Sequence, residues 1–214
     1  MRKKVVIGIV VFVMACVLFG AVVSTALHAD AERKGLGFAT SEQNTYSERH
    51  ENENILASKT IYVPDDYQTI QQAVNNASTG DTIIVRDGTY VENIDINKRL
   101  TIKSENGSAY CIVQAANKSD HVFEITADYV AINGFTVKES ESGAGICLNE
   151  SDFCEITNNH CSDNGDGVYL SDSNGNEIKN NTCSYNEGNG TYLFDSSENE
   201  IKNNTYSHSA LLKL

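Results

Sequence analysis

The chain has 214 residues, a formal net charge of −13, a single proline and no tryptophan. Residues 1–57 carry six basic and six acidic side chains, so the whole net charge falls on the rest of the chain. A surface this acidic repels nucleic-acid phosphates and anionic lipids. No nucleic-acid partner is therefore expected, and a membrane is expected to contact only the N-terminal segment.

Residues 1–29 have the composition of an export signal. A basic stretch at residues 2–4 precedes an uncharged apolar run from Val5 to Val23. That run is also just long enough to span a bilayer, so a cleaved signal peptide and an uncleaved N-terminal anchor both stay open. Either one predicts a secreted, extracellular or cell-surface protein. Residues 30–58 are polar and mixed in charge, and they are expected to form a disordered spacer.

The folded domain is predicted at residues 59–208. It begins with a strand at residues 60–63, after which Pro64, Asp65 and Asp66 stop the strand and offer a helix N-cap. Apolar residues then recur at helical spacing, which predicts one amphipathic helix over residues 67–77. Strands are expected next, over residues 80–85, 88–96 and 99–104, and then with looser periodicity over 109–116 and 121–126.

The C-terminal part of the chain repeats one pattern three times. The copies lie 22 and 23 residues apart and read EITNNHCS (155–162), EIKNNTCS (177–184) and EIKNNTYS (200–207). Each period holds short apolar runs separated by Asn, Gly, Asp and Ser, without the apolar spacing of a helix. These features predict an all-β parallel β-helix, a solenoid of about six coils of roughly 22–24 residues. The single helix would cover the exposed end of its first coil.

Coils of a β-helix stack about 4.8 Å apart, so residues one period apart should form columns. Three inward columns are predicted: Ile132, Ile156, Ile178 and Ile201; Ile125, Leu148, Leu170 and Leu193; and Val137, Cys161, Cys183 and Tyr206. At one turn a structural ladder of hydrogen-bonded amides is expected from Asn159, Asn181 and Asn204.

Five cysteines follow the export segment, and two of them share a predicted column. Cys161 and Cys183 lie one coil apart, within the Cα range of a disulfide. Their shared inward direction fits a buried pair of free thiols equally well. Both interpretations stay open.

Seven Asn-X-Ser/Thr sequons occur, a mild excess over what the composition predicts. Asn180 and Asn203 lie in the turn motif and are expected to point inward, where a glycan has no room. The predicted glycosylation sites are therefore Asn106, Asn117 and Asn149.

Tyr169 and Tyr192 are expected to point outward in one column, with Cys147 in the preceding coil. Two stacked exposed tyrosines would offer a contact to sugar rings, and a plain cross-strand pair explains them as well. A polysaccharide or cell-surface glycan is the partner that this pair suggests.

A candidate Ca²⁺ loop begins at Asp172, Asn174 and Asn176, which resemble the start of an oxygen-ligand site. The pattern is incomplete, because Glu177 stands where such a loop has glycine and Cys183 where it has its closing glutamate. Solvated turn residues are the alternative interpretation, and no cofactor is otherwise expected.

No catalytic residues are assigned. Asp163, Asp166 and Asp172 lie near one another in a single coil, but no carboxylate cluster stacks on them in the next coil. The arginines of the domain, Arg86 and Arg99, lie in its first coils, far from these aspartates. An acid/base constellation built across coils is therefore not expected.

The run IYVPDDYQTIQQAV (61–74), followed by GDTIIVRDGTYVENI (80–94), LTIKS (100–104) and the Asn-Asn repeats, resembles one family. It is similar to the NosD-like and pectate-lyase-like right-handed β-helix proteins, above all their secreted archaeal surface members. The resemblance implies a right-handed solenoid that serves as a surface structural or glycan-binding module.

The resemblance also implies two alternatives. One is a polysaccharide lyase or hydrolase whose active coils are missing or unrecognised, and the other is a NosD-like periplasmic accessory protein of copper maturation. Copper favours Cys, His and Met together. The three histidines of the domain do not share a column: His121, His160 and His208.

Residues 209–214 form a short tail that breaks the repeat without an obvious cap. Because a β-helix has to hide its last coil, we expect either a natural continuation beyond Leu214 or end-to-end self-association through this coil.

Overall fold

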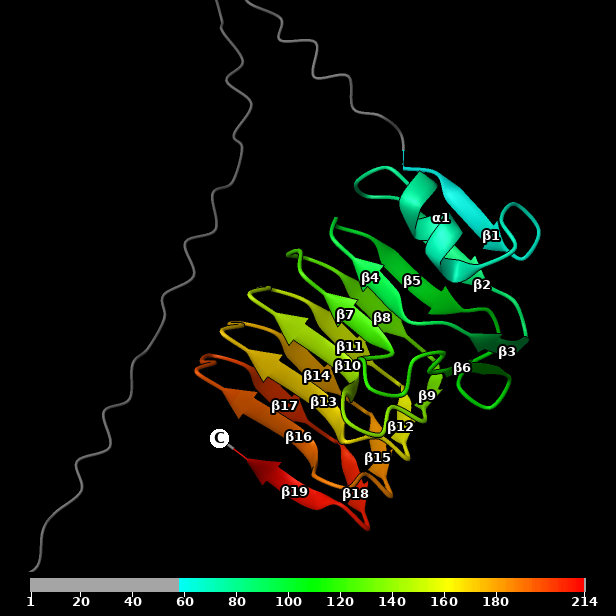
Figure 1. The fold of residues 1–214 in the computed structure, drawn as a ribbon. Coiled ribbons are helices and arrows are strands. Elements are labelled where there is room, and N and C mark those ends of the chain that lie inside the picture. The colour runs from blue at the N-terminus through cyan, green and yellow to red at the C-terminus, as the bar shows by residue number, and fades with distance from the viewer. Residues whose placement is uncertain (1–57, 214) are drawn as a thin grey trace, which may run out of the picture. The chain divides into compact units, whose positions relative to one another are not determined.

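The computed structural model describes residues 58–213, with side chains through residue 210. The predicted export segment at 1–29 and all but the last residue of the spacer at 30–58 lie outside this range. The described residues form a right-handed parallel β-helix with three strands in each of six coils (Figure 1). The predicted fold is confirmed. Within the described range, no helix is both long and apolar enough to cross a membrane.

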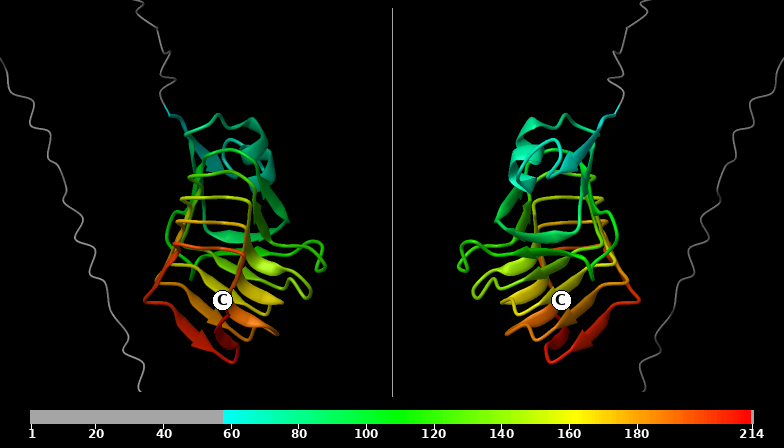
Figure 2. Two further views of the ribbon diagram at one scale, coloured as in Figure 1. Left: turned by 90° about the vertical axis from the view of Figure 1, so that its left-hand side faces the viewer. Right: turned by 90° about the vertical axis from the view of Figure 1, so that its right-hand side faces the viewer.

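Three parallel sheets run along the solenoid, and the side views in Figure 2 show the coils stacked in chain order. The first sheet contains β1 (Thr60–Val63), β2 (Thr82–Val85), β5 (Thr101–Ser104), β8 (Ala131–Asn133), β11 (Glu155–Thr157), β14 (Glu177–Lys179) and β17 (Glu200–Lys202). The second contains β3 (Gly88–Val91), β6 (Cys111–Gln114), β9 (Thr136–Lys138), β12 (His160–Ser162), β15 (Thr182–Ser184) and β18 (Thr205–Ser207). The third contains β4 (Ile94–Ile96), β7 (Phe123–Ile125), β10 (Ala144–Asn149), β13 (Asp166–Ser171), β16 (Asn189–Phe194) and β19 (Ala210–Lys213).

The register of the strands confirms all three predicted inward columns. In the first sheet, Ile156 pairs with Ile132 and Ile178. The leucine column of the third sheet and the Val-Cys-Cys-Tyr column of the second are aligned in the same way. Side chains in these columns are buried through the middle coils. Removing their apolar surface from water contributes about 25 cal/mol per Å² to folding, so identical register in every coil is strongly favoured.

The predicted asparagine ladder is also confirmed. Asn181 Oδ1 accepts a hydrogen bond from the backbone N of Asn159 (2.9 Å), and Asn204 Oδ1 accepts one from the backbone N of Asn181 (2.8 Å). Asn181 Nδ2 donates to the carbonyl of Ile156 (2.7 Å). These amides satisfy backbone groups that a buried turn would leave unpaired. Two further ladders were not predicted, and they join Asn164 to Asn186 and Asn176 to Asn199.

The two asparagines of each Asn-Asn pair have different environments. The second belongs to the ladder and is buried at Asn159 and Asn181 and half-buried at Asn204, whereas the first is exposed in the left-handed region, with φ of 58° at Asn158, 56° at Asn180 and 56° at Asn203. Asparagine tolerates this conformation better than most residues. The expectation that Asn180 and Asn203 point inward is therefore wrong, because the left-handed backbone directs their side chains into solvent.

Helix α1 (Ile70–Asn76) covers the first coil, as predicted, but it is shorter than residues 67–77. Thr69 is its N-cap and accepts a hydrogen bond from the backbone N of Gln72 (3.1 Å). The carboxylate of Glu92, from the first coil, accepts from the backbone N of Ile70 (3.0 Å) and of Gln71 (2.9 Å). The helix start is thus set by a residue about one coil away, and Ile70 is buried against that coil.

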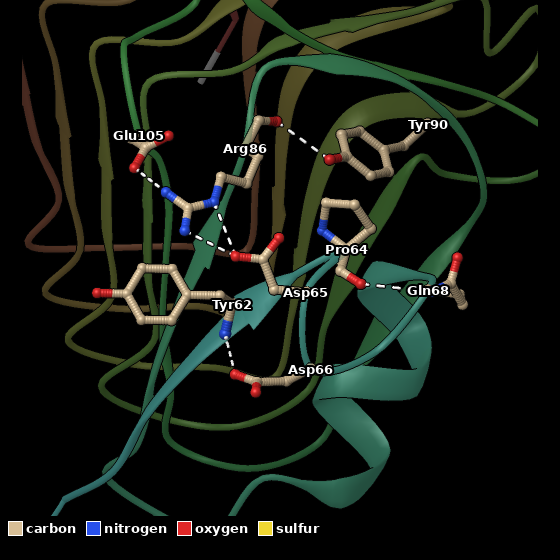
Figure 3. A network of polar contacts seen from close by, with 8 residues as sticks. All are labelled: Tyr62, Pro64, Asp65, Asp66, Gln68, Arg86, Tyr90 and Glu105. Carbon is tan, nitrogen blue, oxygen red and sulfur yellow. Dashed lines mark hydrogen bonds and ion pairs between the residues drawn. The ribbon is translucent and has the colours of Figure 1, made fainter.

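The residues predicted to cap this helix form a different network (Figure 3). Asp65 Oδ2 accepts from Arg86 Nη2 (2.7 Å), which raises the pKa of Arg86, and Arg86 Nη1 also pairs with Glu105. The Arg86 guanidinium carbon lies 4.8 Å from the ring centroid of Tyr62. Asp66 Oδ2 accepts from the backbone N of Tyr62 (2.7 Å). Asp65 therefore connects the turn after β1 to the first coils through Arg86, and Asp66 stabilises the turn itself.

Replacing Glu92 tests the capping role. Glu92→Ala should lower the free energy of unfolding by about 1–2 kcal/mol, because two first-turn N–H groups lose their acceptor. Urea denaturation followed by circular dichroism measures the loss. Glu187→Ala is the matched control, because Glu187 is exposed on a turn and its removal should change stability little. Equal midpoints for the two variants would contradict the capping role.

The last strand lies beyond residue 208, where the domain was predicted to end. β19 pairs with β16 in the third sheet, with Ala210 opposite Asn189 and Leu212 opposite Thr191. Residues 210–213 therefore continue the solenoid by one further strand.

Candidate glycan-binding surface

The predicted tyrosine pair lies in the third sheet. Tyr169 and Tyr192 are opposite each other on β13 and β16, with ring centroids 5.2 Å apart and an interplanar angle of 36°. Both are half-buried, and Cys147 precedes them in the column, as predicted. Burial, with the nearby charge of Glu124, raises the pKa of Cys147 to about 12. The two rings cover part of each other, which is the geometry of a cross-strand aromatic pair.

A groove with a volume of about 240 Å³ lies along the corner between the third and first sheets. It crosses the residues that lead into β5, β8 and β11, and its lining includes Arg99, Tyr129, Phe153 and Glu155. The groove therefore spans three successive coils in the direction of the solenoid axis. None of these four residues was predicted as a site.

Two exposed aromatic rings form one side of this groove. Tyr129 and Phe153 are each 54% exposed, and their rings are stacked with centroids 5.2 Å apart at 18°. Both have left-handed backbones, with φ of 57° and 56°. The next residue in their column is Gly175, where an added Cβ would lie 2.9 Å from Phe153 Cε1. Because glycine has no side chain, this position leaves space for the Phe153 ring.

Arg99 continues the stack at the other end. Its guanidinium carbon lies 5.6 Å from the centroid of the Tyr129 ring, a cation–π arrangement. With the described residues, this guanidinium forms no ion pair and no hydrogen bond. Its donors are therefore available at the groove, as is the carboxylate of the exposed Glu155.

A pattern in the sequence indicates these aromatic residues in hindsight. Tyr129 and Phe153 each stand three residues before the isoleucine of the first inward column, Ile132 and Ile156. Alternation of apolar residues within strands gives no information on aromatic side chains at turns. The pair is visible when each position of the period, turns included, is compared between coils.

The three predicted calcium ligands do not form one site. Asp172 is exposed, whereas Asn176 is only 1% exposed and its Oδ1 accepts from the backbone N of Cys154 (2.7 Å). Asn174 Oδ1 accepts from both the backbone N and the Oγ of Ser197 (2.8 Å each). Both amides are thus parts of turn ladders, and that of Asn176 is directed into the core.

The predicted glycosylation sites differ in their surroundings. Asn117 is exposed, and its Oδ1 accepts from the backbone N of Ser119. The amide of Asn106 donates to Asp87 Oδ1 (3.0 Å). Asn149 is half-buried, and the hydroxyl of its sequon belongs to a fully buried serine, Ser151.

The cysteines of the described residues are all free thiols. Cys161 and Cys183 are opposite each other on β12 and β15 and are both fully buried. A hydrogen bond with Cys183 and burial raise the pKa of Cys161. Burial also raises the pKa of Cys111 to about 12 and that of Cys154 to about 11. Such thiols are poor nucleophiles and poor metal ligands, because both roles require the thiolate.

The three aspartates of this coil are spread over strand β13 and the turns before and after it. Asp163 and Asp172 occupy turns before and after this strand, with φ of 58° and 50°. Asp166 Oδ1 accepts from both the backbone N (2.6 Å) and Nδ2 (3.1 Å) of Asn189. The carboxylate of Asp166 therefore supports the next coil.

The histidines are equally separate. His121 Nδ1 accepts from the backbone N of Ala144 (2.8 Å), His160 Nε2 lies 3.0 Å from Ser184 Oγ, and the His208 ring stacks on Tyr185. Over residues 58–213, no three His, Cys, Asp or Glu side chains are grouped so that they could hold a metal ion. The donor set of this part of the chain does not fit a copper centre.

Comparisons with known proteins agree with the fold. A cell surface glycoprotein from Methanothermus fervidus is 40% identical over 108 residues, which are 50% of this chain and 16% of that protein. The chain thus spans about a sixth of this relative. An alginate lyase from Paenibacillus sp. FPU-7 has a TM-score of 0.52 at 19% identity, over 72% of this chain and 66% of the lyase. Pectin methylesterase PemA from Erwinia chrysanthemi has a TM-score of 0.49 at 13% identity, over 71% and 66%.

At 19% identity the alginate lyase shows likeness of fold alone. The family comparison reaches further, because residues 74–211 match the family described as periplasmic copper-binding protein (NosD). This match runs from the capping helix to the last strand and covers well over half of the sequence. The chain therefore belongs to the NosD family of parallel β-helix proteins.

Proposed function

We propose that this chain is a cell-surface β-helix module that binds glycan chains in the groove beside Tyr129 and Phe153. The similarity to a cell surface glycoprotein and the predicted export segment both support a location outside the cell. The observation that carries the binding role is the groove itself. In it, two half-exposed aromatic rings lie next to the Arg99 guanidinium and the Glu155 carboxylate. That guanidinium forms no ion pair and no hydrogen bond with the described residues.

A sugar ring has apolar C–H faces and a rim of hydroxyl groups. The edges of the Tyr129 and Phe153 rings offer apolar surface to the C–H faces. At the hydroxyl groups, Arg99 can donate hydrogen bonds and Glu155 can accept them. Binding sites for small ligands combine these elements, an apolar lining with a few polar groups. Because the two rings are already stacked, little side-chain entropy is lost when a ligand binds.

The direction of the groove favours a polymer over a single sugar. It crosses three coils along the solenoid axis, so successive sugar units can contact successive coils. The surrounding domain carries the entire net charge of −13, and Arg99 is the cation in the groove lining. Neutral polysaccharides are therefore the expected ligands, and polyuronates should be repelled.

Binding is tested on a panel of neutral and uronate polysaccharides by affinity electrophoresis. The double variant Tyr129→Ala/Phe153→Ala should bind the retained polysaccharide at least about tenfold more weakly, which corresponds to about 1.4 kcal/mol. Tyr185→Ala is the matched control, since Tyr185 is 59% exposed and stacks on His208 at another corner. Circular dichroism checks that both variants fold.

Two outcomes would contradict the proposal. Retention of no polysaccharide by the wild-type chain would remove the binding role, and equal retention by the double variant would remove the groove from it. Reducing ends or unsaturated sugars released from any polysaccharide would instead indicate an enzyme. Asp163→Asn and Asp166→Asn would then show whether the carboxylates beside β13 are responsible.

A further inference from the structure

A second corner of the solenoid, between the first and second sheets, carries a column of exposed asparagines. Asn158, Asn180 and Asn203 occupy the same turn in successive coils, with φ between 56° and 58°. Their backbones are linked, because Asn158 N donates to the Lys179 carbonyl (3.2 Å) and Asn180 N to the Lys202 carbonyl (3.1 Å). The turn is therefore held in one conformation while its side chains project into solvent.

The amides of Asn180 and Asn203 are available for chemistry. Neither side chain makes a hydrogen bond to any residue in the described range. Each begins a sequon, whose hydroxyl belongs to a half-buried Thr182 in the first case and an exposed Thr205 in the second. We propose that Asn180 and Asn203 are attachment sites for N-linked glycans, stacked about 4.8 Å apart on adjacent coils.

Most of the other sequons are occupied by structural contacts. The amides of three asparagines donate to the Gln72 carbonyl, to Asp87 and to Asp166, respectively: Asn76, Asn106 and Asn189. The sequon of Asn149 ends in the buried Ser151, whose hydroxyl donates to the Ile125 carbonyl. Asn117 alone among these five keeps a free, exposed amide NH₂ group with respect to the described residues. Structure thus selects three of the seven sequons, and two of the three lie in one column.

Attachment of an N-linked glycan requires an oligosaccharide donor that is linked to a lipid through pyrophosphate. The Nδ2 of the asparagine forms a bond to the anomeric carbon, and the bond from that carbon to the pyrophosphate oxygen breaks. The lipid pyrophosphate leaves with the bonding electron pair, and Nδ2 loses one proton to a base of the transferase. An Nδ2 already donating to a protein acceptor, as in Asn189, would have to break that bond first.

This inference goes beyond glycan binding and does not depend on the groove. The groove lies at the corner before the first sheet, whereas Asn180 and Asn203 follow strands of that sheet, β14 and β17. Attached glycans would therefore leave the groove open. Failure of one proposal leaves the other standing, because sugar retention and glycan attachment are measured separately.

Asn158 provides a built-in control for the experiment. It has the same turn and the same exposure as Asn180, but His160 replaces the threonine of the sequon. The variant His160→Thr completes the sequon at this turn. His160 lies opposite Thr182 and Thr136 in the second sheet, so a threonine suits its position.

The folded full chain is incubated with a purified oligosaccharyltransferase and a lipid-linked oligosaccharide, and attachment is read by intact mass and by mass spectrometry of glycopeptides. We expect glycans on Asn180 and Asn203, and the loss of one glycan mass each in Thr182→Val and Thr205→Val. His160→Thr should gain one glycan, on Asn158. Peptides containing Asn106, Asn149 and Asn189 serve as internal negative controls.

Modification of those control peptides with Asn180 and Asn203 left bare would overturn the proposal. So would a folded chain that accepts no glycan at these turns while a synthetic peptide spanning Asn180 to Thr182 is modified by the same enzyme. Absence of a gain in a folded His160→Thr variant would show that the turn itself is not recognised.

Discussion

Ile178→Asp should unfold the C-terminal coils of the solenoid. Ile178 is fully buried on β14, in register with Ile156 and Ile201. An aspartate there would bury a carboxylate without a partner, which costs several kcal/mol and removes the apolar contact to two coils. This loss is comparable with the roughly 5–15 kcal/mol that stabilise a typical domain. Thermal melting should show a lower midpoint than that of the wild-type chain. Hydrogen exchange should show unprotected amides in the last coils.

Ile201→Asp is the control within the same column. Ile201 is only half-buried in the sixth coil, so water can solvate the introduced charge and the loss of stability should be much smaller. A further variant, Ile178→Val, removes one methylene and should cost about 0.5–1.5 kcal/mol. If Ile178→Asp melts like the wild-type chain, the inward column is wrongly assigned.

The inward columns could be predicted because the period determines them. Once coils are 22 or 23 residues long, residues such as Ile156 and Ile178 can bury their side chains only by stacking in register. The asparagine ladder follows by the same reasoning, since Asn181 repeats Asn159 at a turn. In both cases the position of a residue within one repeat is enough to predict its partner in the neighbouring coil.

Features that depend on a residue outside the local pattern could not be predicted. The start of the capping helix depends on Glu92, which lies about one coil further along the chain. The outward direction of Asn180 depends on a left-handed backbone, and the apolar pattern carries no signal for such a turn. The candidate groove was missed for the same reason, since Tyr129 and Phe153 are turn residues.

The corners of this solenoid therefore vary in chemistry from coil to coil, while its strands keep one register. One corner column changes from tyrosine and phenylalanine to glycine and then glutamate: Tyr129, Phe153, Gly175 and Glu198. Another presents glycine and then three asparagines: Gly134, Asn158, Asn180 and Asn203. Because the side chains of the non-glycine residues in these columns are exposed, a substitution of one of them costs little core packing. Both proposed functional surfaces lie on such corners.

The two residues of the Asn-Asn pair differ in their contacts, so their substitutions should differ in their effect on stability. Asn181→Ala should destabilise the chain strongly, because it removes the acceptor of the Asn159 backbone N–H and the donor to the Ile156 carbonyl. Each of these groups is buried, and a buried group left without a partner costs about 1–3 kcal/mol. The two losses together should shift the urea midpoint well below that of the wild-type chain.

Asn180→Gly changes the adjacent residue of the same turn and should be nearly neutral. Its side chain is exposed and makes no hydrogen bond to the described residues, and glycine adopts the φ of 56° without strain. The comparison separates the ladder from the turn, since both variants lose an asparagine amide within two consecutive positions. Equal destabilisation by the two substitutions would mean that the turn conformation, and not the buried amide ladder, stabilises this corner; a neutral Asn181→Ala would mean that water replaces the missing amide.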